Sequence, residues 1–131
     1  MLMNFEHVGL TCSDMNKTIE FYCGLLGLKE VLRKPTHTGG EVAFLDAGGG
    51  MLEIVRPKGA VQSPAREMPR SEAGIRHFTL TVDDLDATYE RLVAAGVTFT
   101  EPPRDAYNPE ILKRVAFCLD PDGISVELTQ R

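Results

Sequence analysis

Two short stretches of the sequence decide the fold, because they repeat each other. The first reads Glu6-His7-Val8-Gly9-Leu10-Thr11, and the second, with residue numbers higher by 70, reads Arg76-His77-Phe78-Thr79-Leu80-Thr81. Further matches follow in the same order, since Val42-Ala43-Phe44 returns as Val115-Ala116-Phe117. Several ordered matches predict two copies of one structural module. We place these copies at about residues 4–56 and 73–131.

Each copy predicts the same order of elements, β-α-β-β-β. Apolar and polar residues alternate over 5–11 and 74–82, which indicates strands with one packed face and one freer face. Asp14 is the predicted N-cap of a helix that runs from Met15 to Leu26 at helical apolar spacing, and a second helix covers about 84–95. The other strands are predicted at about 28–34, 40–46, 50–55, 97–100, 112–119 and 123–129. We therefore expect an α+β chain in which two tandem modules form a single domain, residues 1–131.

Two proline-containing stretches interrupt this plan. Three prolines fall in 57–72, which we predict to be the connector between the modules. Three more fall in 101–110, which we predict to be irregular. Irregular segments of that length are often lids or binding loops, although a surface loop without a function fits equally well.

Composition excludes several classes of function. The 131 residues include 14 Lys and Arg against 19 Asp and Glu, for a net charge of −5, which argues against nucleic-acid binding. No apolar run approaches the ~18 residues of a membrane span, and the first residues do not have the pattern of a signal peptide. The cysteines are Cys12, Cys23 and Cys118, an odd number without C-x-x-C spacing, so disulfides and a thiolate zinc site are not expected. The default setting is a reducing cytoplasm.

Four residues of metal-ligand type recur in the two copies. His7 and His77 lie on the first predicted strand of each copy, and Glu53 and Glu127 lie on the last. All four are predicted mid-strand, on the freer face, where a carboxylate is costly unless it is paired or bound to a cation. A single such His or Glu is more often an ordinary core or surface residue. Recurrence in both copies favours a site for one divalent ion, with nitrogen and oxygen ligands that suit nickel, cobalt, zinc, manganese or iron(II).

Three motifs make the sequence similar to a known superfamily. They are His7-Val8-Gly9-Leu10, the run Ile19-Glu20-Phe21-Tyr22 before Leu26-Gly27-Leu28, and Asp120-Pro121-Asp122-Gly123 before Glu127. With them the chain resembles, over nearly its whole length, the vicinal oxygen chelate superfamily of glyoxalases, bleomycin-resistance proteins and dioxygenases. The resemblance implies paired β-α-β-β-β modules whose mixed sheet curls around a metal and substrate cavity. Its ligand positions correspond here to His7, Glu53, His77 and Glu127, a set most similar to that of glyoxalase I.

Two positions depart from glyoxalase I. That enzyme usually has an Arg where Thr11 stands and an Asn where Pro57 stands, and the Arg binds a glutathione carboxylate. The metal ligands are therefore retained while the glutathione contacts are not. We expect another small, anionic substrate, with Thr11, Arg104 and Tyr107 as candidate substrate-binding residues.

The resemblance also implies a chemistry, which is proton transfer next to a metal-bound carbonyl by a lyase or isomerase. Glu127 is the first candidate for the catalytic base and Glu53 the second. Nickel, cobalt or zinc is the favoured metal, with manganese or iron as further options, and family members usually form homodimers. Three alternatives stay open: a methylmalonyl-CoA-type epimerase, an iron(II) ring-cleaving dioxygenase that uses His7, His77 and Glu127, and a non-catalytic protein that binds a small molecule or drug.

Overall fold

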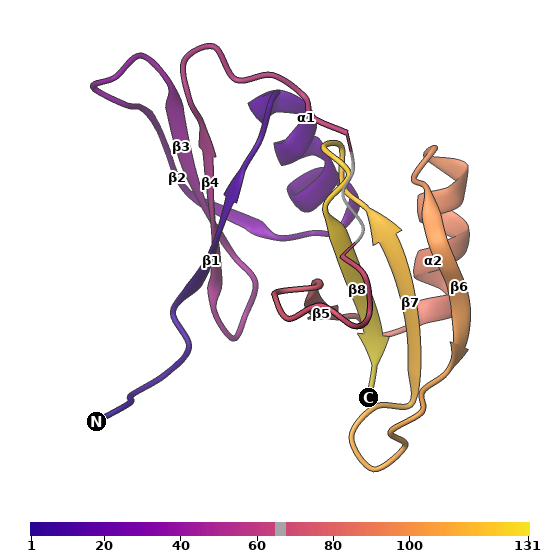
Figure 1. Ribbon diagram of the computed structural model, residues 1–131. Helices are drawn as coiled ribbons and strands as arrows, with labels where there is room; N and C mark the ends of the chain where they lie inside the picture. The colour runs from indigo at the N-terminus through magenta and orange to yellow at the C-terminus, as the bar shows by residue number, and fades with distance from the viewer. Residues whose placement is uncertain (65–67) are drawn as a thin grey trace. The chain divides into compact units, whose positions relative to one another are not determined.

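The computed structural model describes residues 1–64 and 68–131. The chain divides into two compact units, Met1–Ser63 and Pro64–Arg131 (Figure 1). The boundary falls in the predicted connector 57–72, of which residues 65–67 lie outside the described residues. In the described part of the chain, no helix has both the length and the apolar character needed to span a membrane.

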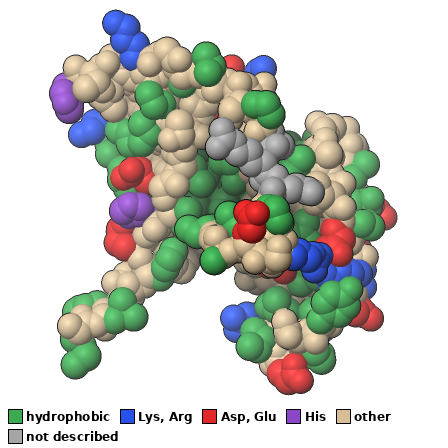
Figure 2. All heavy atoms as spheres, in the orientation of Figure 1, with side chains coloured by type: hydrophobic (Ala, Val, Ile, Leu, Met, Phe, Trp, Pro, Cys, Tyr) green, Lys and Arg blue, Asp and Glu red, His purple; other side chains and the backbone are tan. Residues whose placement is uncertain are grey.

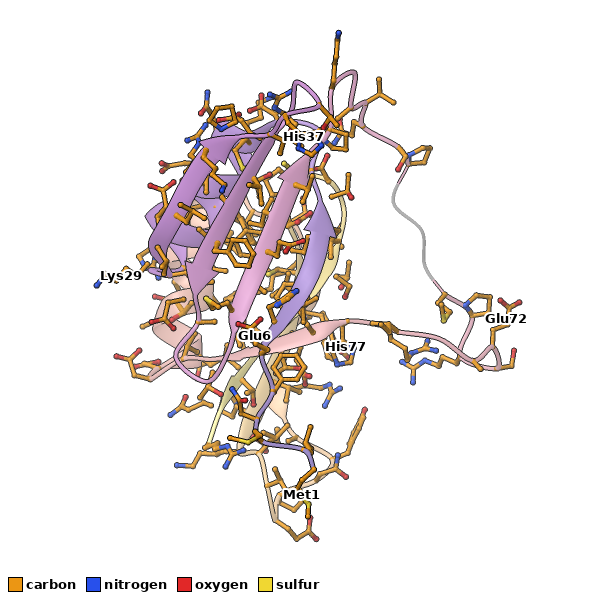
Figure 3. All side chains as sticks on the ribbon, turned by 90° about the vertical axis from the view of Figure 1, so that its left-hand side faces the viewer. Met1, Glu6, Lys29, His37, Glu72 and His77 are labelled. Atoms are coloured by element: carbon orange, nitrogen blue, oxygen red, sulfur yellow. The ribbon has the colours of Figure 1, made fainter. Side chains whose placement is uncertain are left out.

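The first unit is one β-α-β-β-β module. Its strands form a four-stranded sheet in the order β1-β4-β3-β2, in which β1 runs parallel to β4 and the other neighbours are antiparallel. Figure 3 looks onto this sheet, with the helical segment behind the strands. The elements are β1 (His7–Thr11), α1 (Met15–Ile19), the π-helix η1 (Glu20–Leu25), β2 (Lys29–Pro35), β3 (Glu41–Asp46) and β4 (Met51–Arg56).

The second unit repeats the plan. Its sheet has the order β5-β8-β7-β6, again with the first strand of the module parallel to the last. The predicted α+β class and tandem module order are thereby confirmed, with one mixed four-stranded sheet in each unit. The elements are β5 (Phe78–Thr81), α2 (Leu85–Ala94), β6 (Phe99–Asp105), β7 (Arg114–Leu119) and β8 (Ser125–Gln130).

Alternation along the central strands puts the core on one face of each sheet. In each unit, residues two apart on the two central strands are almost fully buried, and so are the helix residues of the same unit. Their neighbours along the strands therefore point to the opposite face, where the candidate ligands lie. The buried side chains are Ala43, Leu45, Leu52 and Ile54 with Met15 and Tyr22 in the first unit, and Ala116, Cys118, Val126 and Leu128 with Leu85 and Leu92 in the second.

The helices begin as predicted, but the first one ends differently. The Asp14 carboxylate accepts a hydrogen bond from the backbone N–H of Lys17, and Asp84 accepts one from Ala87, so both are N-caps. From Glu20 onward the first helix is a π-helix, in which the backbone N–H of Leu26 donates to the carbonyl of Phe21, five residues back. The prediction of one continuous α-helix up to Leu26 was wrong in this respect.

Two strand boundaries also differ from the predictions. Strand β6 extends to Asp105, so the prediction of an irregular segment from residue 101 was wrong over 101–105. Pro102 and Pro103 are tolerated there because β6 is one of the two outer strands of its sheet, and its register with β7 shifts between Glu101 and Arg104. Strand β5 begins only at Phe78 and is shorter than the predicted strand 74–82.

Candidate functional site

The first unit brings one His-Glu pair together on the open face of its sheet. His7 Nε2 lies 3.8 Å from Glu53 Oε2. The neighbours of Glu53 in the sheet are Gly9 on β1 and Phe44 on β3. The His7 ring meets the Phe44 ring edge-on, with centroids 5.9 Å apart. The pair is half-exposed, with 38% of the His7 side chain and 33% of the Glu53 side chain accessible.

The second unit holds an equivalent and tighter pair. His77 Nε2 lies 3.0 Å from Glu127 Oε2, and the Thr79 hydroxyl donates a hydrogen bond of 2.6 Å to the same oxygen. Thr79 and Phe117 are the sheet neighbours of Glu127, and the His77 ring meets Phe117 edge-on at 5.1 Å. Only 11% of the Glu127 side chain is accessible. Glu127 is thus a nearly buried carboxylate with two polar partners.

The strand positions of these residues were predicted only in part. Glu53 and Glu127 lie mid-strand, as expected, but His7 is the first residue of β1 and His77 precedes β5 by one residue. Each His reaches its Glu because the first and last strands of each module are parallel neighbours. Within either unit, no further His, Cys, Asp or Glu of the described residues completes a metal-binding group. Each unit therefore supplies a pair of candidate ligands.

The His7 ring has a carboxylate on each side. Its Nδ1 hydrogen bonds to the carboxylate of Glu6, which raises the pKa of His7, and the charge of Glu53 acts in the same direction. Figure 2 shows a histidine flanked by acidic side chains on the exposed face of the first unit. A hydrogen bond between one ring nitrogen and a carboxylate is usual for a metal-binding His, since it orients the other nitrogen. In the second unit the corresponding residue is Arg76, which donates instead to the backbone carbonyls of Met68 and Pro69.

Each pair fits two ligand positions of a divalent metal ion in donor type and spacing. Bonds of about 2.1 Å place two ligand atoms about 3.0 Å apart at right angles and about 3.4 Å apart in a tetrahedron. The N–O separation of 3.0 Å between His77 and Glu127 matches the first value. The separation of 3.8 Å between His7 and Glu53 exceeds the second by a few tenths of an ångström, which a half-exposed side chain can close.

The predicted substrate residues fall in both units. Arg104 and Tyr107 are brought together, with the guanidinium carbon 4.1 Å from the centre of the Tyr107 ring. The Arg104 Nε also donates to Glu101 at 2.9 Å, and Glu101 raises the pKa of Arg104, with a smaller effect of the Glu127 charge. Thr11 is an exposed residue at the end of β1, four residues beyond His7.

Four residues of the site were not singled out from the sequence. Phe44 and Phe117 form the apolar side of the two pairs, and their positions in the repeated Val-Ala-Phe tripeptide could have identified them. Thr79 contacts Glu127 from the neighbouring strand, which a single sequence does not reveal. Glu6 contacts His7 from the residue before the strand, where strand alternation no longer applies. The site therefore depends on neighbours that only the folded chain defines.

Comparison with known proteins places this architecture in a family. The profile of the Glyoxalase/Bleomycin resistance protein/Dioxygenase superfamily matches residues 4–128. The chain belongs to this superfamily. Its members include metal-dependent enzymes and also proteins that are not enzymes.

Individual relatives cover nearly the whole chain. A probable lactoylglutathione lyase of Vibrio cholerae is 32% identical, over 95% of this chain and 88% of its own length. The glutathione transferase FosA of Serratia marcescens is 28% identical, over 98% of this chain and 81% of its own. The crystal structure of a glyoxalase family protein from Enterococcus faecalis is 27% identical, with a TM-score of 0.73 over 96% of each chain.

Proposed function

We propose that this superfamily member is a metal-dependent lyase or isomerase of the glyoxalase type, which transfers a proton next to the carbonyl group of a small substrate. The observation that carries the proposal is the duplicated His-Glu pair, with N–O separations of 3.0 and 3.8 Å. In the proposed centre His7, Glu53, His77 and Glu127 bind one divalent ion, with both pairs from one chain or from the two chains of a homodimer. Nickel, cobalt or zinc is favoured for these ligands, while manganese and iron remain compatible.

Glu127 is the proposed base, with Glu53 as the second candidate. A divalent ion bound there would polarise the substrate carbonyl. The Oε2 atom of Glu127 accepts the hydrogen bond from Thr79, whereas no residue in 1–64 or 68–131 donates to its Oε1. That oxygen is available to take a proton from the carbon next to the carbonyl and to return it to the same or the neighbouring carbon.

The proposed substrate is a small carbonyl compound with an anionic group. Arg104 supplies the positive charge that binds the anionic group, and the Tyr107 ring stacks on its guanidinium. Thr11 lies on the same face of β1 as His7. Thr11 offers a hydroxyl where a glutathione carboxylate would need a cation. The names of two relatives refer to glutathione. For this chain we propose an anion other than a glutathione adduct.

The test combines metal analysis with proton exchange. The purified chain should contain, or take up, about one nickel, cobalt or zinc ion per four-ligand centre. Candidate α-hydroxy and α-keto acids or thioesters, and the glutathione hemithioacetal, are then incubated in deuterated buffer and followed by NMR. Glu127→Gln should slow exchange into the true substrate by ~10²–10⁴-fold, because a positioned base contributes that much.

Controls separate the competing functions. Glu110→Gln changes an exposed carboxylate outside both pairs and should exchange at the wild-type rate. If Glu127→Gln exchanges the substrate proton as fast as the wild type and Glu53→Gln exchanges it much more slowly, Glu53 is the base. Iron with oxygen consumption would identify a ring-cleaving dioxygenase, and tight ligand binding without metal or exchange would identify a binding protein. Rapid turnover of the glutathione adduct would refute the proposed substrate class.

A further inference from the structure

The two His-Glu pairs differ at one position of the sheet. Both have a histidine at the first residue of the first strand or just before it, a glutamate in the last strand and an edge-on phenylalanine. Directly across from Glu127 on the neighbouring parallel strand stands Thr79. At the same register position across from Glu53 stands Gly9, which has no side chain.

This difference coincides with a difference in how the carboxylates are held. Glu127 Oε2 accepts the 2.6 Å hydrogen bond from the Thr79 hydroxyl and lies 3.0 Å from His77 Nε2. Glu53 accepts no hydrogen bond from any residue that the structure describes, and its Oε2 lies 3.8 Å from His7 Nε2. The glutamate with the hydroxyl neighbour is therefore the one already at ligand spacing from its histidine.

We propose that Thr79 is a positioning residue of the metal centre. Its hydroxyl fixes the Glu127 carboxylate with one oxygen beside His77, so that the second unit presents a preformed pair of ligands, while Glu53 must settle when the metal binds. A hydrogen bond to a ligand carboxylate lowers the cost of ordering that side chain and keeps it in the ionised form that binds metal. This inference rests on the proposed metal-dependent function.

The test measures the affinity of the full chain for cobalt(II), by visible absorption and by competition with a chelator. Thr79→Val keeps the branched side chain and removes the hydroxyl, so cobalt affinity should fall about 10–100-fold, the usual loss for such a partner of a metal ligand. Thr79→Ser restores a hydroxyl and should bind cobalt close to the wild-type affinity. Thr81→Val is the matched control, because Thr81 is also exposed and faces the same side of β5.

A gain of affinity can be tested in the first unit. Gly9 has no positive φ angle, and a Cβ placed there would meet no atom within 4 Å, so the strand accepts a larger residue. Gly9→Thr places a hydroxyl across from Glu53 at the register that Thr79 occupies across from Glu127. It should tighten cobalt binding, and this result does not depend on how well Thr79→Val folds.

The outcomes distinguish this inference from the proposed function. The role of Thr79 is supported if the wild-type chain binds cobalt and Thr79→Val binds it more weakly than Thr81→Val, provided that the two variants have the same stability in urea. If the wild-type chain binds cobalt and the two variants bind it with equal affinity, the role of Thr79 is overturned and the metal centre stands. A chain that takes up no cobalt overturns both proposals. Failure of Gly9→Thr to tighten binding would overturn the claim that the hydroxyl across the strand pair presets the glutamate.

Discussion

At the scale of single residues, burial decides what each cysteine can do. Cys118 is fully buried on β7 and Cys12 is nearly so, whereas Cys23 is only partly covered. Burial, with a further contribution from the charge of Asp120, raises the pKa of Cys118 to about 12. Its thiol therefore stays protonated and covered at neutral pH, which fits a packing role and not a nucleophilic one.

We predict that Cys118 resists alkylation in the folded chain. At pH 8, iodoacetamide should label Cys23 first, and Cys118 only after unfolding in urea, as peptide mass spectrometry would show. The same pKa predicts an alkaline loss of stability. Because the folded pKa lies above the unfolded value of 9.0, the stabilisation is complete below pH 9 and is lost as the pH rises toward 12. Equal labelling rates of Cys118 in native and urea-unfolded protein would contradict this prediction.

The strand positions of Glu53 and Glu127 could be predicted, because each lies in the last strand of its module and the two modules repeat each other. Their role as metal ligands stays a prediction. The role of Thr79 could not be predicted, since a threonine in a strand is ordinary and its partner is 48 residues away in the chain. Glu6 was hidden for a different reason, because it lies outside β1, where alternation no longer assigns faces.

At the scale of elements, the two helices start from equivalent caps. Asp84 accepts a 3.0 Å hydrogen bond from the backbone N–H of Ala87, at the first turn of a helix that lies against β6, β7 and β8. Asp84→Ala should lower the free energy of unfolding by about 1 kcal/mol, the usual cost of losing an N-cap side chain. The free energy of unfolding is measured from urea titrations monitored by circular dichroism.

Two variants control this experiment. Asp84→Asn retains an oxygen that can accept the same hydrogen bond and should recover most of the loss. Glu90→Ala changes an exposed residue inside α2 and should leave stability unchanged or slightly higher, because alanine favours helix. A loss in Glu90→Ala as large as in Asp84→Ala would show that charge, and not the cap, is responsible.

The mispredicted elements show that residue preferences alone do not give a strand's place in its sheet or the type of a helix. Prolines argue against a helix or a central strand, but Pro102 and Pro103 lie on an outer strand with a shifted register, where a missing N–H costs little. Apolar spacing in the first helix predicts which side is buried. It does not distinguish hydrogen bonds to the fourth residue back from those to the fifth, which form in η1.

At the scale of the whole molecule, the internal repeat predicted the paired modules because duplication constrains many positions at once. The same duplication does not specify whether a first-unit pair would share a metal ion with the second-unit pair of its own chain or of another chain. In each unit the helical segment covers one face of the four-stranded sheet, and the other face carries the His-Glu pair, which is half-exposed in the first unit and more buried in the second. If these residues bind a divalent ion, two ligands are too few for a stable centre, and we therefore expect a second pair from the same chain or from a second copy.

We predict that the chain is a two-fold homodimer. Strand β2 is an outer strand of its sheet and is exposed at every residue, with 58% of Val31 and 41% of Leu32 accessible. Exposed apolar residues on a strand with one unpaired edge are often covered by another chain. Light scattering at micromolar concentration should give twice the chain mass of 14.4 kDa. A monomer at that concentration would contradict the prediction.

Mixing two inactive variants then shows how the dimer arranges its metal centres. One variant carries His7→Ala and Glu53→Gln, and the other carries His77→Ala and Glu127→Gln. If each centre combines the first unit of one chain with the second unit of its partner, a mixed dimer has one centre with all four ligands and one with none. When equal amounts of the two chains are unfolded together and refolded, about half of the dimers are mixed, and each mixed dimer keeps one centre of two. Cobalt binding and proton exchange should then return to about a quarter of the wild-type level. If both pairs come from one chain, every centre lacks one pair and neither activity returns. Refolded wild type, carried through the same procedure, sets the level against which recovery is measured.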